Sequence, residues 1–207
     1  MKIPVKKLTL MAILTAVALI IFIIEAQIPL PVPVPGVKLG LANAVTLFAL
    51  FYTSEAGGQV QGFTLTPKVK PCTCPPASLR FFYIKDNIKY FSIYNVLFIL
   101  LCRIILGAVF TGRPIVVVYS LAGGMLAFIA MVVMKRFVSD KQIWVCGAIG
   151  AVFHNIGQIL AAIIITGTPS IAAYLPILII TGVITGILTG LVAQFTLERL
   201  EKMPIVL

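Results

Sequence analysis

The stretch 143-IWVCGAIGAVFHNIGQILAAIIIT-166 contains no aspartate, glutamate, lysine or arginine. A helix needs about 20 apolar residues to cross the hydrocarbon core of a bilayer, and this stretch is long enough. Further apolar runs that are nearly free of charge lie at 8–28, 91–110, 115–134 and 171–197, with a shorter one at 40–53. The proline-rich segment before the short run cannot form a lipid-facing helix. These runs predict an all-α integral membrane protein, a compact bundle of six transmembrane helices.

The composition favours the same class of protein. Only 11% of the 207 residues are charged, whereas 60% are hydrophobic. A water-soluble chain of this length could not cover so much apolar surface with so few charges. We therefore expect one transmembrane domain over residues 1–207, with the lipid bilayer as its surroundings.

The basic residues are distributed unevenly between the predicted loops. With the amino terminus inside and six spans, all 16 lysines and arginines except Lys38, Arg103 and Arg113 fall on the cytoplasmic face. This asymmetry follows the positive-inside rule. It predicts a membrane protein with both termini in the cytoplasm. It also accounts for the net charge of +10 as a topology signal, so nucleic acid is not an expected partner.

Residues 54–90 interrupt the apolar pattern. This segment mixes Gly, Pro, Thr and Lys without a helical or alternating period, and it is too long for an ordinary connection between helices. We expect a poorly ordered cytoplasmic insertion. Its cysteine pair, 71-PCTCPP-76, has no second Cys or His cluster to complete a zinc site, and a reducing compartment disfavours disulfides. No metal site and no cofactor are predicted.

Small residues recur at four-residue spacing in several predicted helices. Gly182, Gly186 and Gly190 form a ladder on one face of the last span, where glycine lets a neighbouring backbone come close. We interpret the ladder as helix packing within the bundle. Ala12 and Ala16 have the same spacing near the cytoplasmic end of the first span, where a partner protein could dock.

Functional residues should be among the polar side chains that remain in the membrane, because each is costly there unless it is paired or hydrated. These are Glu25, Gln27, Asn43, Arg103, His154, Asn155 and Gln158. In the six-span topology they lie beneath the outer surface, under the loop that carries Lys38. This convergence predicts a substrate pocket that opens outward. The alternative is an internal network in which Arg103 pairs with Glu25 and the amides satisfy bent backbone.

The charges of this region predict the kind of ligand. Arg103 and Lys38 face one acid, Glu25, and an arginine in a low-dielectric site favours a carboxylate or phosphate. Asn43, Asn155 and Gln158 can both donate and accept hydrogen bonds. We expect a small anionic or zwitterionic ligand. Lys38, in a loop, should be better solvated than Arg103 and should contribute less to binding.

Four segments carry a resemblance to a known family: 31-PVPVPGVKLGLANAVTLFAL-50, 101-LCRIILGAVFTG-112, 119-YSLAGGMLAF-128 and 150-GAVFHNIGQILAAIIITGTPSIAAYLP-176. They resemble the heptaprenyl diphosphate synthase component I family, also called the Gx transporter family. That family is similar to the substrate-binding S components of energy-coupling factor transporters. The resemblance covers nearly the whole chain except the insertion, which the family replaces by a short connection. It implies six helices, a substrate bound near the outer face, and an Ala-xxx-Ala surface, matched by Ala12 and Ala16, that contacts a membrane partner.

The sequence lacks the groups that catalysis would need. Polyprenyl diphosphate synthases hold magnesium on Asp-rich clusters, but Asp86 and Asp140 are the only aspartates and lie far apart. There is no Walker A sequence and no Ser-His-Asp or Cys-His arrangement, so no catalytic residue is predicted.

Two functions remain open. The chain is either the substrate-binding subunit of a small-molecule uptake transporter, energised by a membrane coupling protein with ATPases, or the non-catalytic membrane component of a polyprenyl diphosphate synthase. The second would dock a soluble synthase subunit or hold a lipid-like product.

Overall fold

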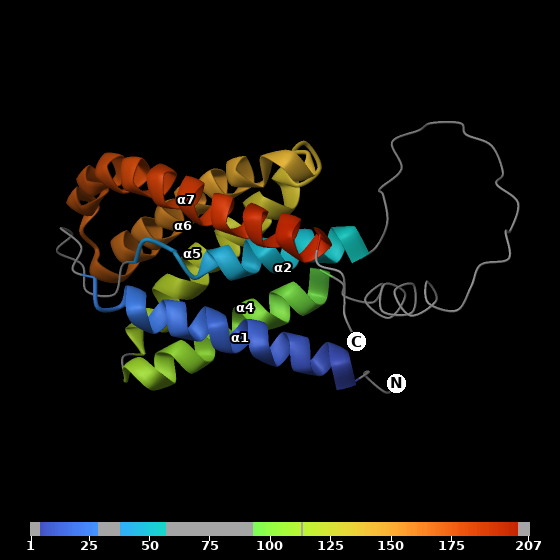
Figure 1. The fold of residues 1–207 in the computed structure, drawn as a ribbon. Coiled ribbons are helices and arrows are strands. Elements are labelled where there is room, and N and C mark those ends of the chain that lie inside the picture. Colours follow the sequence, from blue (N-terminus) through green and yellow to red (C-terminus); the bar gives the residue numbers. More distant parts are fainter. Residues whose placement is uncertain (1–4, 29–37, 57–92, 113, 203–207) are drawn as a thin grey trace, which may run out of the picture.

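The computed structural model describes residues 5–28, 38–56, 93–112 and 114–202 (Figure 1). Within these residues the chain forms helices joined by turns and irregular segments, and no strands. The α-helices are α1 (Val5–Glu25), α2 (Asn43–Ala56), α4 (Ile93–Thr111), α5 (Ile115–Met134), α6 (Ile143–Thr166) and α7 (Leu175–Lys202), and the 3-10 helices are η1 (Asp140–Gln142) and η2 (Pro169–Tyr174). The all-α fold class expected from the sequence is confirmed.

Five helical segments are long and apolar enough to cross a membrane, namely Lys7–Glu25, Ile93–Thr111, Ile115–Met134, Ile143–Thr166 and Pro169–Leu200. The sixth, α2, is different: its apolar part covers only Asn43–Tyr52. At 1.5 Å per residue a helix of 14 residues spans about 21 Å, less than the ~30 Å of a hydrocarbon core. The chain therefore has the architecture of a multi-pass membrane protein with one short helix.

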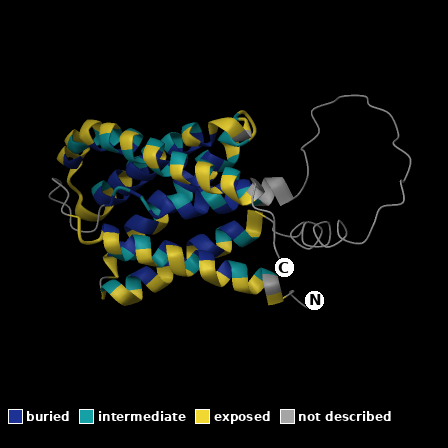
Figure 2. Cartoon of the chain, viewed as in Figure 1, coloured by how far each residue is buried: buried dark blue, intermediate teal, exposed yellow. Residues whose placement is uncertain are grey.

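Helix α2 tolerates its short length because protein surrounds it. It contacts each of the other five α-helices, and Leu47, Ala49 and Phe51 are almost completely buried. Non-helical backbone next to such a helix can lie at membrane depth only where protein covers it. The other helices combine exposed residues, many of them apolar, with buried residues along their length (Figure 2).

Helices α6 and α7 are in backbone contact. A Cβ atom on Gly147 would lie 2.5 Å from the carbonyl oxygen of Gly186, and one on Gly190 would lie 2.5 Å from the Cα atom of Trp144. No side chain fits at these positions. The glycine ladder of α7 thus lies against α6 within the same chain.

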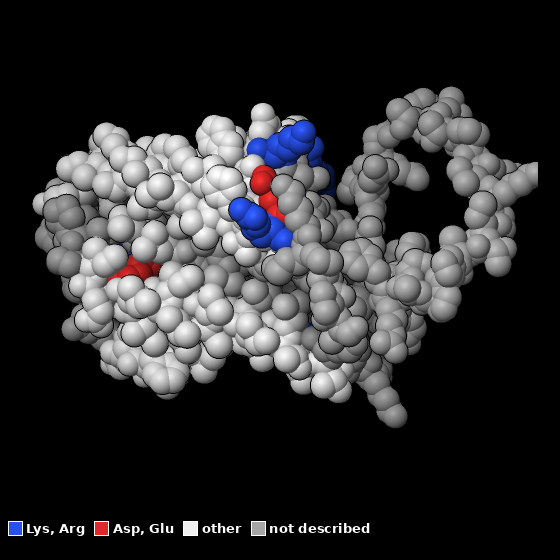
Figure 3. All heavy atoms as spheres, viewed as in Figure 1, with Lys and Arg blue, Asp and Glu red and all other residues white. Residues whose placement is uncertain are grey.

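The two ends of the bundle differ in charge. Helix α1 begins and α7 ends at one end, which we call the terminal end (right in Figure 1). The visible face of the bundle in Figure 3 is almost uncharged, and its lysines and arginines gather towards the terminal end. The opposite end carries two turns, at Gly112 and Gly167, with φ values of 63° and 64°.

Several helix bounds differ from the expected spans. Helices α5 and α6 coincide with the runs at 115–134 and 143–166, but α2 continues through Ala56 into the segment expected to be an insertion. The last span begins before the expected residue 171, with the 3-10 helix η2. Pro169 occupies the first position of η2, and a second proline, Pro176, lies in the first turn of α7. The rest of the expected insertion, with its cysteine pair, lies outside the described residues.

Candidate functional site

A short segment, Lys38–Ala42, precedes α2 at the end of the bundle opposite the terminal end. We call this segment the strap. Its backbone is tied to two helices: the Lys38 N–H donates to Oε1 of Gln158 on α6 at 2.9 Å, and the Gly40 and Leu41 N–H groups donate to Oε1 of Glu25 on α1. These bonds hold irregular backbone in place at the side of a membrane bundle, where each unpaired amide would be costly.

Glycine is required in the strap. Gly40 has a φ of +83°, and a Cβ atom there would lie 2.7 Å from Cδ2 of His154. The strap therefore lies directly on the imidazole ring. A larger residue would be strained by its conformation and would also push the strap away from α6.

Arg103 lies beneath the strap on α4 and is only 2% exposed. Its Nη2 donates to Oδ1 of Asn43, the first residue of α2, at 3.2 Å. An arginine stays charged in this setting, so its burial is expensive unless other groups compensate it. Glu25 on α1, itself buried, is near enough to interact with it electrostatically.

His154 and Gln158 face the same space from α6. Both are buried, and they fit against α5 because residue 123 is glycine: a Cβ atom on Gly123 would lie 2.8 Å from Cγ of Gln158 and 2.9 Å from Nδ1 of His154. Helix α5 thus lies directly against both side chains.

Lys38 is buried, contrary to the expectation that its loop position would leave it solvated. Its Nζ lies 3.1 Å from the centroid of the Phe22 ring and donates to the Phe22 carbonyl oxygen. Burial lowers the pKa of Lys38 to about 8, while the Glu25 carboxylate raises it and Arg103 lowers it. The lysine is still mostly protonated at neutral pH. Its ammonium group rests against α1.

Together these side chains form what we call the polar cluster: Glu25, Lys38, Asn43, Arg103, His154 and Gln158. Three buried nitrogen atoms of the cluster have no hydrogen-bond partner in the described part of the chain: Asn43 Nδ2, Arg103 Nε and Gln158 Nε2. Buried polar atoms are rarely left in this state. The cluster is therefore incomplete without a further group.

A model of the family described as heptaprenyl diphosphate synthase component I matches residues 14–59 and 87–196. The chain belongs to this family. The matched ranges contain the whole polar cluster and leave out residues 60–86, which lie inside the expected insertion. Neither the curated proteins nor the solved structures gave a match.

In this component I family member, two of the expected polar residues lie apart from the cluster. Asn155 faces α7, where its Nδ2 donates to the Leu178 carbonyl oxygen at 2.6 Å and lies against Gly182. It links α6 to α7. Gln27 is exposed just beyond the end of α1. The cluster also includes contacts that sequence reasoning missed, at Gly40, Gly123 and Phe22.

Ala12 and Ala16 lie on the outside of the bundle. They belong to an exposed row of residues at four-residue spacing along α1, which also contains Leu8, Ile20 and Ile24. The side chains of this face are apolar, and the two in its middle, Ala12 and Ala16, are small. It is therefore accessible for a partner helix.

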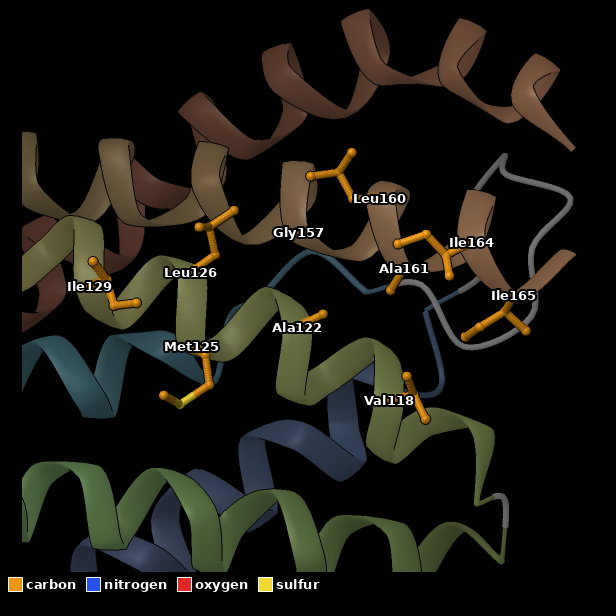
Figure 4. Close-up of a pocket in the computed structure, with 10 residues that line it drawn as sticks. All are labelled: Val118, Ala122, Met125, Leu126, Ile129, Gly157, Leu160, Ala161, Ile164 and Ile165. Carbon is orange, nitrogen blue, oxygen red and sulfur yellow. The ribbon is translucent and has the colours of Figure 1, made fainter. Parts of the chain in front are cut away.

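An apolar groove of about 430 Å³ runs along α5 and α6. Figure 4 shows its lining, which consists of Val118, Ala122, Met125, Leu126, Ile129, Gly157, Leu160, Ala161, Ile164 and Ile165. Gly157 brings the two backbones together here, since its Cβ would lie 2.7 Å from the Ala122 carbonyl oxygen. The neighbouring Gly123 contacts the polar cluster, so the groove and the cluster are adjacent but chemically opposite.

The described residues contain no group of three or more His, Cys, Asp and Glu side chains that could hold a metal ion. The polar cluster has one carboxylate, one imidazole and two cations, and the cations would repel a metal. The side-chain N–H groups of the polar cluster can instead donate hydrogen bonds to a bound molecule.

Proposed function

We propose that the chain is the substrate-binding subunit of a small-molecule uptake system, with the polar cluster as its binding site. The observation that carries this proposal is the burial of two cations, an acid and a histidine from three helices and the strap at one end of a membrane bundle. Ionisable side chains inside membrane proteins are costly, and they mark substrate or ion sites by default.

A purely structural network explains the cluster less well. In such a network Arg103 would pair with Glu25. Among the described residues, Arg103 instead donates to Asn43, and Glu25 accepts from the backbone of the strap. Several polar atoms remain without partners. A bound ligand accounts for those atoms, whereas a completed network would not leave them.

The strap supplies a route of access. Three of its backbone N–H groups donate to two side chains, Glu25 and Gln158, and its Lys38 ammonium donates to the Phe22 carbonyl oxygen. We infer that these contacts break when a ligand enters and that contacts with the ligand replace them. With the basic terminal end in the cytoplasm, the strap faces outward and the subunit captures its ligand from outside.

The orientation has a direct test by cysteine labelling. In a background with the four native cysteines replaced by serine, we expect a membrane-impermeant maleimide to label Thr168→Cys in intact cells and to miss Ser139→Cys. Both positions are exposed, and they lie at opposite ends of the bundle. Labelling of Ser139→Cys alone would invert the proposed topology, and labelling of both after cell lysis is the control for reactivity.

Transport would need energy from partners, because the chain has no Walker A sequence. We expect the α1 face with Ala12 and Ala16 to dock a membrane coupling protein. The double substitution Ala12→Leu and Ala16→Leu should reduce co-purification of this partner from native membranes at least about tenfold, because bulky side chains prevent close backbone approach. Since both alanines are exposed, the melting temperature of the isolated chain should not change.

The same experiment separates the second candidate function. The family name implies a partner synthase subunit, and the apolar groove along α5 and α6 could hold an isoprenoid chain. Recovery of a soluble prenyl synthase, with no ATPase, would favour the non-catalytic synthase component and count against uptake. A loss of folding in the alanine double variant would show instead that these residues pack within the chain.

A further inference from the structure

The partners that are missing from the polar cluster are all of one kind. Three cluster side chains have acceptor oxygens in use: Glu25 Oε1 accepts from the strap, Asn43 Oδ1 accepts from Arg103, and Gln158 Oε1 accepts from Lys38. The unpartnered atoms are Arg103 Nε, Asn43 Nδ2 and Gln158 Nε2, which can only donate. The cluster has spare donors and lacks acceptors.

Exchanging the nitrogen and oxygen positions of the Gln158 and Asn43 side-chain amides does not remove this imbalance. If Gln158 were flipped, its NH2 group would face the Lys38 N–H, so two donors would meet. If Asn43 were flipped, its NH2 group would meet the guanidinium of Arg103. In both cases an unfavourable contact would replace a hydrogen bond, so the neighbours fix the amide orientations.

The charges are unbalanced in the same direction. Lys38 and Arg103 carry two positive charges, and Glu25 is the one acid that the described residues place beside them. Arg103, His154 and Gln158 are each at least 97% buried, so solvent does not screen them effectively. A group with negative charge and several acceptor oxygens would correct both deficits.

We propose that the polar cluster binds an oxyanion, the carboxylate or phosphate group of a small molecule, through Arg103 Nε, Asn43 Nδ2 and Gln158 Nε2. This inference rests on the binding site of the proposed function and names its ligand class. The strap lies over the oxyanion, and it moves at Gly40 when the oxyanion enters the site.

The test measures thermal melting of the full chain in detergent with defined probes. Sodium phosphate, sodium pyrophosphate and sodium succinate are compared with sodium chloride at equal ionic strength, and phosphatidic acid in mixed micelles separates a lipid phosphate from a soluble one. At least one probe should raise the melting temperature of the unaltered chain by about 3 °C or more. Arg103→Gln should lose this increase.

Two isosteric substitutions test the missing acceptor without knowledge of the ligand. Asn43→Asp replaces an unpartnered donor by a carboxylate oxygen beside Arg103, so it should raise the melting temperature in sodium chloride and abolish the effect of the probes. Asn155→Asp is the matched control. It places a carboxylate against the Leu178 carbonyl oxygen and should lower the melting temperature.

The inference is overturned if no probe shifts the unaltered chain, if the shift persists in Asn43→Asp, or if Asn43→Asp is destabilised like Asn155→Asp. Buried water rather than an anion would then complete the cluster. Should Arg103→Gln fail to fold, Asn43→Asp still decides. A negative result would exclude an oxyanion but not a neutral ligand, and it would not change the result of the partner experiment. Failure of this inference is therefore distinguishable from failure of the proposed function.

Discussion

Gly186→Leu is expected to prevent the chain from folding into a stable bundle. A Cβ atom at this position would lie 2.7 Å from the Cα atom of Ala148 and 2.7 Å from the carbonyl oxygen of Gly147. These are backbone atoms, so no side-chain rotation can make room. Overpacking commonly costs about 1–3 kcal/mol where side chains can move. Here we expect about 3 kcal/mol or more, because the whole α6–α7 contact must open.

The measurement is the yield of monodisperse protein in detergent together with its melting temperature. Val192→Leu on the same helix is the matched control, since Val192 is 64% exposed. The control should behave like the unaltered chain. A Gly186→Leu variant that melts within about 2 °C of the unaltered chain would contradict the backbone contact.

Arg103→Gln is expected to reduce affinity for the stabilising oxyanion probe at least about tenfold, because a lost charge-assisted hydrogen bond is worth about 1.5–3 kcal/mol. Lys38→Gln should have a smaller effect. The reason is its position: the Lys38 ammonium lies on the Phe22 ring and bonds to the Phe22 carbonyl oxygen, away from the unpartnered donors. Isothermal titration calorimetry with the probe measures both losses.

A competing account of Arg103 makes a different forecast. If Arg103 and Glu25 were a structural ion pair, each single change to glutamine would destabilise the chain, and the double change would restore stability with ligand binding intact. We expect no such recovery, because Glu25 holds the strap and Arg103 holds Asn43. Recovery of both stability and binding in the double variant would refute the role of Arg103 in the site.

Much of the fold could be predicted because the bilayer imposes a simple requirement on the sequence. Uncharged runs of sufficient length predict helices whatever their neighbours are, and α5 and α6 have the expected bounds. Helix α2 was harder to place. Its length is set by the protein around it and by the strap before it, and neither leaves a periodic signal at residues 40–56.

The polar cluster could be predicted only in part. Topology places Glu25, Asn43, Arg103 and the pair His154 and Gln158 at related depths, and the structure brings these five together. Depth does not determine which way a residue faces. Asn155 is adjacent to His154 in sequence but lies about 100° around the helix and faces α7.

The burial of Lys38 and the close approach at Gly40 and Gly123 depend on tertiary contacts between distant segments. Hydropathy assigns Lys38 to a loop, yet the Phe22 ring and the strap remove it from solvent. Glycines next to buried polar residues were the available signal. In 39-LGLAN-43 and 120-SLAGG-124 the missing side chains make room for His154 and Gln158.

The central claim is that the polar cluster holds a small molecule. Its most direct test is mass spectrometry of the small molecules released by denaturation from the chain purified out of native membranes, alongside Arg103→Gln prepared in the same way. We predict one anionic molecule in near-stoichiometric amount from the unaltered chain, absent from a folded Arg103→Gln. An unaltered chain that releases no anion, or a variant that retains the same molecule in the same amount, would contradict the account.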